Sequence, residues 1–117
     1  MNLCRLSTVV AILFCCIGYA AATDNVDTRK LTLVEENHAV LTIDNVGYTL
    51  DSYIIMFQQP YYVKVRRDDG KPMQVEEAVK IAKEYIQPRG CTEPISRRTD
   101  LDRFNSDKSQ WLIGILC

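Results

Sequence analysis

One amphipathic segment, residues 73–91, constrains the fold of this chain more than any other. Its apolar side chains fall at i, i+3, i+4, i+7, i+10 and i+11, which is one face of an α-helix. Most of the remaining positions are charged. The apolar set is Val75, Ala78, Val79, Ala82, Tyr85 and Ile86. A helix with one apolar face must cover another apolar surface, which the rest of the chain has to supply.

The end of this helix leads directly into a cysteine. Pro88, Arg89 and Gly90 are expected to end the helix, and Cys91 follows. Outside the N-terminal leader the other cysteine is Cys117, the last residue. An even number of cysteines in an exported chain favours a bridge, so we predict a Cys91–Cys117 disulfide. The chain-entropy model gives a loop of about 27 residues a stabilisation of about 3.5 kcal/mol.

The first 22 residues have the pattern of a secretory signal peptide. Arg5 makes the start positive, residues 6–18 form an uncharged apolar run, and small residues precede a cleavage site before Thr23. The apolar run is shorter than the roughly 20 residues that span a bilayer, which disfavours a retained membrane anchor. A single exported domain over residues 23–117, periplasmic or extracellular, is therefore predicted.

Three of the five cysteines lie in this leader and are expected to leave with it. They are Cys4, Cys15 and Cys16. Lipidation at Cys15 or Cys16 is the alternative, but neither has a small residue before it.

Composition fits one globular domain and argues against a nucleic-acid binder. The chain has 117 residues, 47% of them hydrophobic and 25% charged, with a formal net charge of −1. Such values disfavour disorder, and nucleic-acid binding normally requires a basic excess.

Alternating apolar and polar residues predict strands on both sides of the helix. The predicted strands cover residues 31–34, 39–43, 48–57, 61–67 and 111–117, after a loose polar lead-in at residues 23–30. Residues 35–38 and 44–47 are the predicted hairpin turns. The last strand is apolar on both faces, so it should return to the middle of the sheet, and Gly114 should mark a close approach. The prediction is an α+β fold in the order β-β-β-β-α-β, mainly antiparallel, packed by one helix.

The residues that could carry chemistry do not assemble into a recognisable catalytic motif. Cys91 and His38 are the available cysteine–histidine pair, but a bridged cysteine is no nucleophile. An oxygen-rich loop cluster lacks the spacing of a calcium-binding loop, so no metal or cofactor is expected. That cluster is Asp100, Asp102, Asn105 and Asp107.

A basic and aromatic set of residues is the best candidate for a binding surface. Three members share one face of the strand at residues 61–67, and three arginines lie in the loop at residues 91–108. They are Tyr62, Lys64, Arg66, Arg97, Arg98 and Arg103. Arginine and tyrosine are enriched at interface hot spots. The surface is predicted to dock an acidic partner protein or an anionic envelope surface.

These features favour a non-catalytic protein-binding or inhibitor-like module. The leading reasons are small size, a predicted bridge and the lack of a catalytic motif. Two alternatives stay open at this point. One is a small secreted hydrolase that uses acidic residues of the 91–108 loop, and the other is a structural subunit of an envelope assembly.

Overall fold

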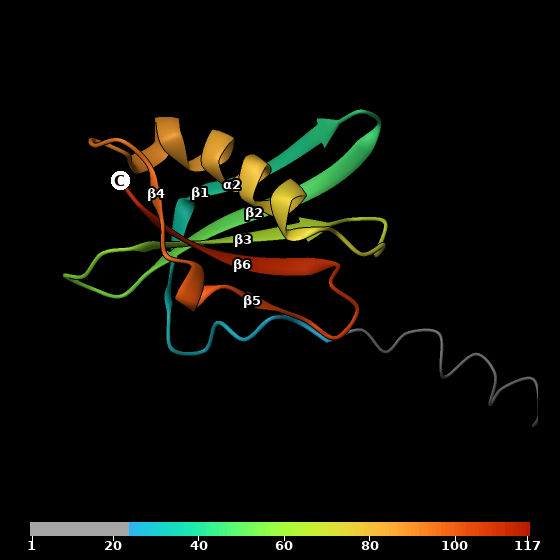
Figure 1. Cartoon of the computed structure of the whole chain (residues 1–117), viewed down its shortest axis with the longest axis horizontal. Coiled ribbons are helices and arrows are strands. Elements are labelled where there is room, and N and C mark those ends of the chain that lie inside the picture. The colour runs from blue at the N-terminus through green and yellow to red at the C-terminus, as the bar shows by residue number, and fades with distance from the viewer. Residues whose placement is uncertain (1–23) are drawn as a thin grey trace, which may run out of the picture.

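The computed structural model describes residues 24–117, which form an antiparallel sheet with one helix lying across one face (Figure 1). The predicted signal peptide and its cleavage site lie outside the described residues. The elements are β1 (Thr32–Ile43), β2 (Val46–Ile54), β3 (Tyr61–Arg67), α2 (Val75–Gly90), β4 (Ser96–Arg97), a 3₁₀ turn (Thr99–Leu101), β5 (Arg103–Phe104) and β6 (Gln110–Leu116). The predicted α+β class and the Cys91–Cys117 disulfide are confirmed.

The strands pair in the order β1-β2-β3-β6-β4, and the short β5 also pairs with β6. All of these pairings are antiparallel. The last long strand therefore returns to the middle of the sheet, as its two apolar faces predict. Placing β6 beside β3 joins the two halves of the chain that α2 separates.

Within residues 24–117, three strands and not four precede α2. The hairpin turn predicted at residues 35–38 is wrong, because β1 runs through it with an irregular register between Val34 and Ala39. Within this bulge Asn37 is buried, its side-chain amide donates to Oγ of Ser52 at 2.9 Å, and its carbonyl accepts from the hydroxyl of Tyr85. These bonds hold the polar residues 35–38 on the sheet. The sequence suggested a turn because a polar, solvent-facing stretch of strand can have the same composition as a turn.

The next connection is a tight hairpin, as predicted. Asp44 and Asn45 have φ of 50° and 65°, the left-handed values that a two-residue hairpin turn requires. Residues 24–31 are more ordered than the predicted loose lead-in, because Val26 is buried and its amide donates to Oε1 of Gln110 at 3.1 Å. That bond fixes the N-terminal segment against β6.

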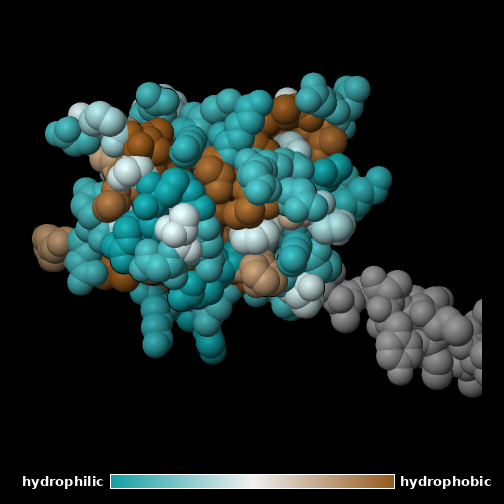
Figure 2. Space-filling model, in the orientation of Figure 1, coloured by the Kyte–Doolittle hydropathy of each residue, from teal (hydrophilic) through white to brown (hydrophobic). Residues whose placement is uncertain are grey.

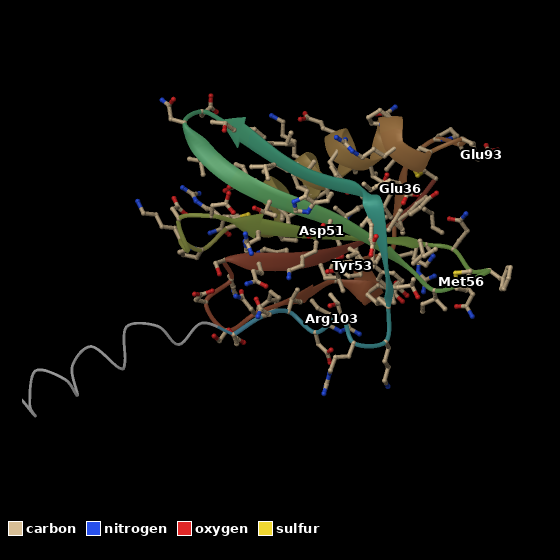
Figure 3. All side chains as sticks on the ribbon, turned by 180° about the vertical axis from the view of Figure 1, so that it is seen from behind. Glu36, Asp51, Tyr53, Met56, Glu93 and Arg103 are labelled. Atoms are coloured by element: carbon tan, nitrogen blue, oxygen red, sulfur yellow. A yellow bond between two sulfur atoms is a disulfide. The ribbon has the colours of Figure 1, made fainter. Side chains whose placement is uncertain are left out.

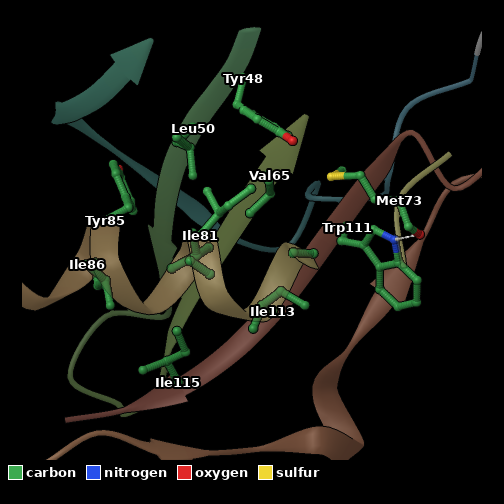
Figure 4. Close-up of a cluster of buried hydrophobic side chains, with 13 residues drawn as sticks. Tyr48, Leu50, Val65, Met73, Ile81, Tyr85, Ile86, Trp111, Ile113 and Ile115 are labelled. Atoms are coloured by element: carbon green, nitrogen blue, oxygen red, sulfur yellow. Dashed lines mark hydrogen bonds between the residues drawn. The ribbon is translucent and has the colours of Figure 1, made fainter. Parts of the chain in front are cut away.

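The core lies between α2 and the face of the sheet beneath it (Figure 4). The buried helix residues are Ala78, Ile81, Ala82, Tyr85 and Ile86, whereas Val75 and Val79 of the predicted apolar face are half-buried at its margin. Ile81 was not part of the predicted face. The sheet contributes fully buried side chains from its three central strands, namely Leu50, Val63, Val65, Ile113 and Ile115.

Trp111 closes one end of this core. Its indole N–H donates to the carbonyl oxygen of Met73 at 3.1 Å, so the start of the helix segment is attached to β6. Met73 itself is buried just before the helix begins.

Gly114 lies where another segment crosses β6 closely, as predicted. A Cβ at this position would lie 2.9 Å from the carbonyl oxygen of Arg98 and 3.0 Å from Cβ of Leu101. Neither atom can move without shifting the 3₁₀ turn that covers this part of β6.

We expect Gly114→Ala to lower the free energy of unfolding by about 1–3 kcal/mol, the usual cost of overpacking. The matched control is Gly47→Ala, because its new Cβ would meet the exposed carboxylate of Asp68, 3.1 Å from Oδ2. Since that side chain can swing away, Gly47→Ala should cost less than about 0.5 kcal/mol. Urea unfolding measures both, and equal losses in the two variants would contradict the packing described for Gly114.

Candidate functional site

One end of the sheet gathers features that are distant in the sequence. The loop between β2 and β3, residues 55–60, projects there beside the end of α2 and the C-terminus (Figure 1). Figure 3 places Glu36, Met56 and Glu93 at this same end. We call it the loop end of the molecule.

Two large apolar side chains stand exposed on this loop. Met56 is 55% exposed and Phe57 is 99% exposed, and we call these two residues the apolar tip. Phe57 has φ of 63°, a left-handed conformation that a bulky side chain rarely adopts. The amide of Gln58 donates to the carbonyl of Ile55 at 3.0 Å and closes the turn around the tip. The fold thus keeps the Phe57 side chain exposed to solvent while its backbone adopts an unfavourable left-handed conformation.

The base of the loop is held from two sides. Tyr61, the first residue of β3, donates its hydroxyl to the carbonyl of Gly90 at 3.1 Å and pairs with Ile115 in the sheet. A Cβ on Gly90 would lie 2.6 Å from that hydroxyl oxygen, so glycine at the helix end makes the contact possible. The Cys91–Cys117 disulfide then joins the residue after the helix to the residue after β6.

Backbone hydrogen bonds add to this clamp. The amides of Thr92 and Glu93 donate to the carbonyl of Cys117 at 3.0 and 2.8 Å. The end of the helix, the end of β6 and the start of β3 are therefore tied together at the base of the loop that carries the apolar tip.

A cavity of about 510 Å³ opens beside the loop. Val34, Ile54, Pro60 and Tyr61 supply apolar wall. The charged residues in its lining are Glu36 and Arg89. The Arg89 guanidinium donates to the carbonyl of Tyr85 at 2.6 Å and lies 4.4 Å above the Tyr85 ring. This arrangement can hold an apolar side chain or a short peptide segment, with one acidic and one basic group available at its edge.

The predicted basic surface is only partly brought together. Tyr62, Lys64 and Arg66 share the face of β3 turned away from α2, and Figure 3 shows Arg103 near this face. Arg103 and Tyr62 line one hollow together with Leu112. Arg97 lies elsewhere, in a groove beside Val75, Val79 and Lys83 of the helix.

Acidic neighbours pair with most of these arginines. The ion pairs are Arg66–Asp68 at 3.4 Å, Arg97–Asp102 at 2.5 Å and Arg98–Asp100 at 2.8 Å. The hydrogen bond from Arg98 lowers the pKa of Asp100, which keeps that carboxylate charged. Burial lowers the pKa of the Lys64 ammonium. Binding through these residues stays a prediction, and the surface as a whole carries both signs of charge.

The acidic loop cluster has structural partners. Asp102 pairs with Arg97 and accepts from the amide of Gly114 at 3.3 Å, and Asp107 accepts from Ser109 at 2.6 Å. Asn105 is buried and donates to the carbonyl of Asp24 at 3.1 Å. Within residues 24–117 no three histidine, cysteine or acidic residues gather as metal ligands. These contacts stabilise the loop and the N-terminal segment.

His38 lies on β1 and not in the predicted hairpin turn. Its Nδ1 is 2.7 Å from Oδ1 of Asp51 on the neighbouring strand. Cys91 is bonded to Cys117, so the cysteine–histidine pair considered from the sequence does not form.

Met56 and Phe57 are the residues that the sequence reasoning missed. The predicted strand at residues 48–57 ends at Ile54, and the apolar run continues into the loop. The sequence cannot show where the strand ends, because an apolar run before Gln58, Gln59 and Pro60 looks the same whether its last residues belong to the strand or to the loop. The left-handed φ of Phe57 leaves no signature in the sequence.

Comparison with protein-family models, with curated proteins and with solved structures finds no match for this chain. Among residues 24–117, no helix has the length and apolar character needed to cross a membrane.

The exposure and backbone conformation of Phe57 predict that this residue does not contribute to the stability of the folded domain. Phe57→Asn should raise the free energy of unfolding by about 0.5–1 kcal/mol, because asparagine tolerates φ above zero and the phenyl ring contacts little. The control is Phe104→Asn, which removes a ring packed 5.0 Å from that of Trp111 and should lower stability. A loss of stability in Phe57→Asn, measured by urea unfolding, would show that the tip supports the fold.

Proposed function

We propose that this chain is an exported, non-catalytic protein-binding module of an inhibitor-like kind, which inserts its apolar tip into a hydrophobic pocket of a partner protein. The observation that carries the proposal is the full exposure of Phe57 on a left-handed backbone above a clamped base. Strained residues of this kind concentrate at ligand clamps and active sites.

The energetics favour such a role. Burying a phenylalanine side chain contributes roughly 1.5–3 kcal/mol, and aromatic residues dominate interface hot spots. A loop already held in its bound shape loses little conformational entropy on docking. The bonds from Tyr61 and the nearby disulfide limit the motion of the loop base. The tip is thus prepared to bind without reordering.

The conformation of the tip favours insertion into a pocket over imitation of a substrate. Peptides that bind a partner as an added strand are extended along their length. Phe57 at φ of 63° interrupts an extended path. The partner is therefore expected to offer a pocket for one or two side chains, and the cavity beside the loop can take a side chain of the partner in return.

Charges around the tip favour a protein over an anionic envelope surface. Membrane-surface binding relies on clusters of lysine and arginine. The lining of the cavity includes Glu36 as well as Arg89, and three of the four arginines of the predicted basic surface are paired with carboxylates. Export accords with the disulfide, since such bonds persist in oxidising compartments.

The two alternatives rest on weaker grounds. A hydrolase using the acidic loop would have to free Asp102 and Asp107 from the contacts that hold the loop. A structural subunit would use larger surfaces than a two-residue tip.

Photo-cross-linking tests the proposal. With p-benzoylphenylalanine in place of Phe57, illumination of the producing cells should yield one adduct of defined mass with another protein. The matched control carries the same group in place of Phe104, which is 53% exposed and outside the loop end. Excess unlabelled protein should abolish the adduct, whereas excess Phe57→Ala should compete at least about tenfold less well. Identical adducts from both positions, or none from position 57, would contradict the proposal.

A further inference from the structure

The two edges of the sheet differ in how they are protected. One edge consists of the two-residue strands β4 and β5, which both pair with β6 and are too short to recruit another strand. The other edge is β1, which is 12 residues long and pairs on one side with β2. Along β1 the bulge at residues 35–38 and the charges of Glu35 and Glu36 protect the first half. The second half, residues 39–43, we call the open edge.

None of the usual protective devices occurs on the open edge. Its sequence is Ala-Val-Leu-Thr-Ile, with no charge, no proline and three β-branched residues. Val40 is 64% exposed on the face turned away from the helix. An uncharged edge of high β-propensity is a template for another strand.

The hairpin fixes which backbone groups are free. Ile43 and Val46 close a two-residue turn and so form a hydrogen-bonded pair, and the pairs alternate from there along the ladder. Thr42 and Val40 therefore fall at non-hydrogen-bonded positions with β2. Their amides and carbonyls point outward, ready for a strand on the other side.

We infer that the open edge pairs with the open edge of a second copy of this chain, antiparallel and centred on Leu41. In that register Val40 of one copy forms a hydrogen-bonded pair with Thr42 of the second copy, and Thr42 of the first copy forms the same pair with Val40 of the second. Each pair exchanges two backbone hydrogen bonds, which gives four in total. Leu41 faces Leu41 of the second copy. The same register sets the backbone of His38 opposite Asp44 of the second copy at both ends, where regular pairing stops because Asp44 begins the hairpin turn.

Apolar surface at the hairpin supports this occupant. Ala39, Leu41 and Ile43 pack at the margin of the core and are half-buried. The helix lies mainly over β3 and β6, and the β1–β2 hairpin extends past it (Figure 1). Figure 2 shows apolar surface at this hairpin. In the inferred pair, these apolar side chains of one copy lie beside the same side chains of the second copy and are buried further. A polar partner strand would not bury them in this way.

Single cysteines test both the pairing and its register. Residues facing each other at a non-hydrogen-bonded pair have Cα atoms about 4.5 Å apart, within disulfide range. Leu41→Cys in the protein recovered after export, with the native bridge intact, should therefore form a covalent dimer under mild oxidation. Ala39→Cys is the matched control, since in this register the two introduced cysteines lie about 13 Å apart along the strands. The double variant Ala39→Cys/Ile43→Cys should restore the cross-link.

Sedimentation of the unmodified chain over a micromolar concentration series provides the second readout. We expect a reversible dimer, and Val40→Lys should make it monomeric. Because Val40 is exposed, the urea midpoint should not change when both proteins are unfolded at a concentration where the unmodified chain is monomeric. Equal cross-linking of Leu41→Cys and Ala39→Cys, or a monomer at every concentration, would overturn the inference. Neither outcome depends on the apolar tip, so the proposed function is tested separately.

Discussion

The pairing of β6 with β3 is the interaction on which the rest of the structure depends. It joins the C-terminal strand to the N-terminal meander and supplies the floor on which α2 packs. Two tethers keep β6 in place, one from Trp111 to the carbonyl of Met73 and the other through the Cys91–Cys117 disulfide. Each tether attaches one end of the helix segment to one end of β6. A domain of this size buries a modest core, so these attachments matter for its stability.

The disulfide tether also helps to explain why the apolar tip can exist. An exposed phenylalanine with a left-handed backbone gains nothing from its surroundings, so the loop that carries it needs support from elsewhere. That support comes from Tyr61 and from the bridge beneath it. The inferred pairing of open edges lies away from this end, at the β1–β2 hairpin. Because the pairing is antiparallel, the two tips of a dimer would project from opposite ends of one continuous sheet and would reach two partners.

The sequence contained most of the fold and little of the site. The hydrophobic periodicity located α2, β3 and β6, because these elements follow from the local pattern of residues. The Cys91–Cys117 disulfide was predicted because an exported chain with two cysteines outside its leader favours a bridge between them. The bulge in β1 was missed because its cause is tertiary, namely the buried bonds of Asn37 to Ser52 and Tyr85. The apolar tip was missed because a backbone angle, and not a residue type, removes Phe57 from the sheet. The predicted basic surface overlooked the carboxylates that the fold sets beside its arginines.

Amide hydrogen exchange in the oxidised and the reduced protein tests the central claim most directly. If the bridge clamps the loop end, reduction should speed exchange most at the hydrogen-bonded amides of Thr92, Glu93 and the C-terminal end of β6. The Arg67 amide, which donates to the carbonyl of Ser109 at the far end of β3, should change only with global stability. A uniform increase across both ends, or no change near Cys117, would contradict the account.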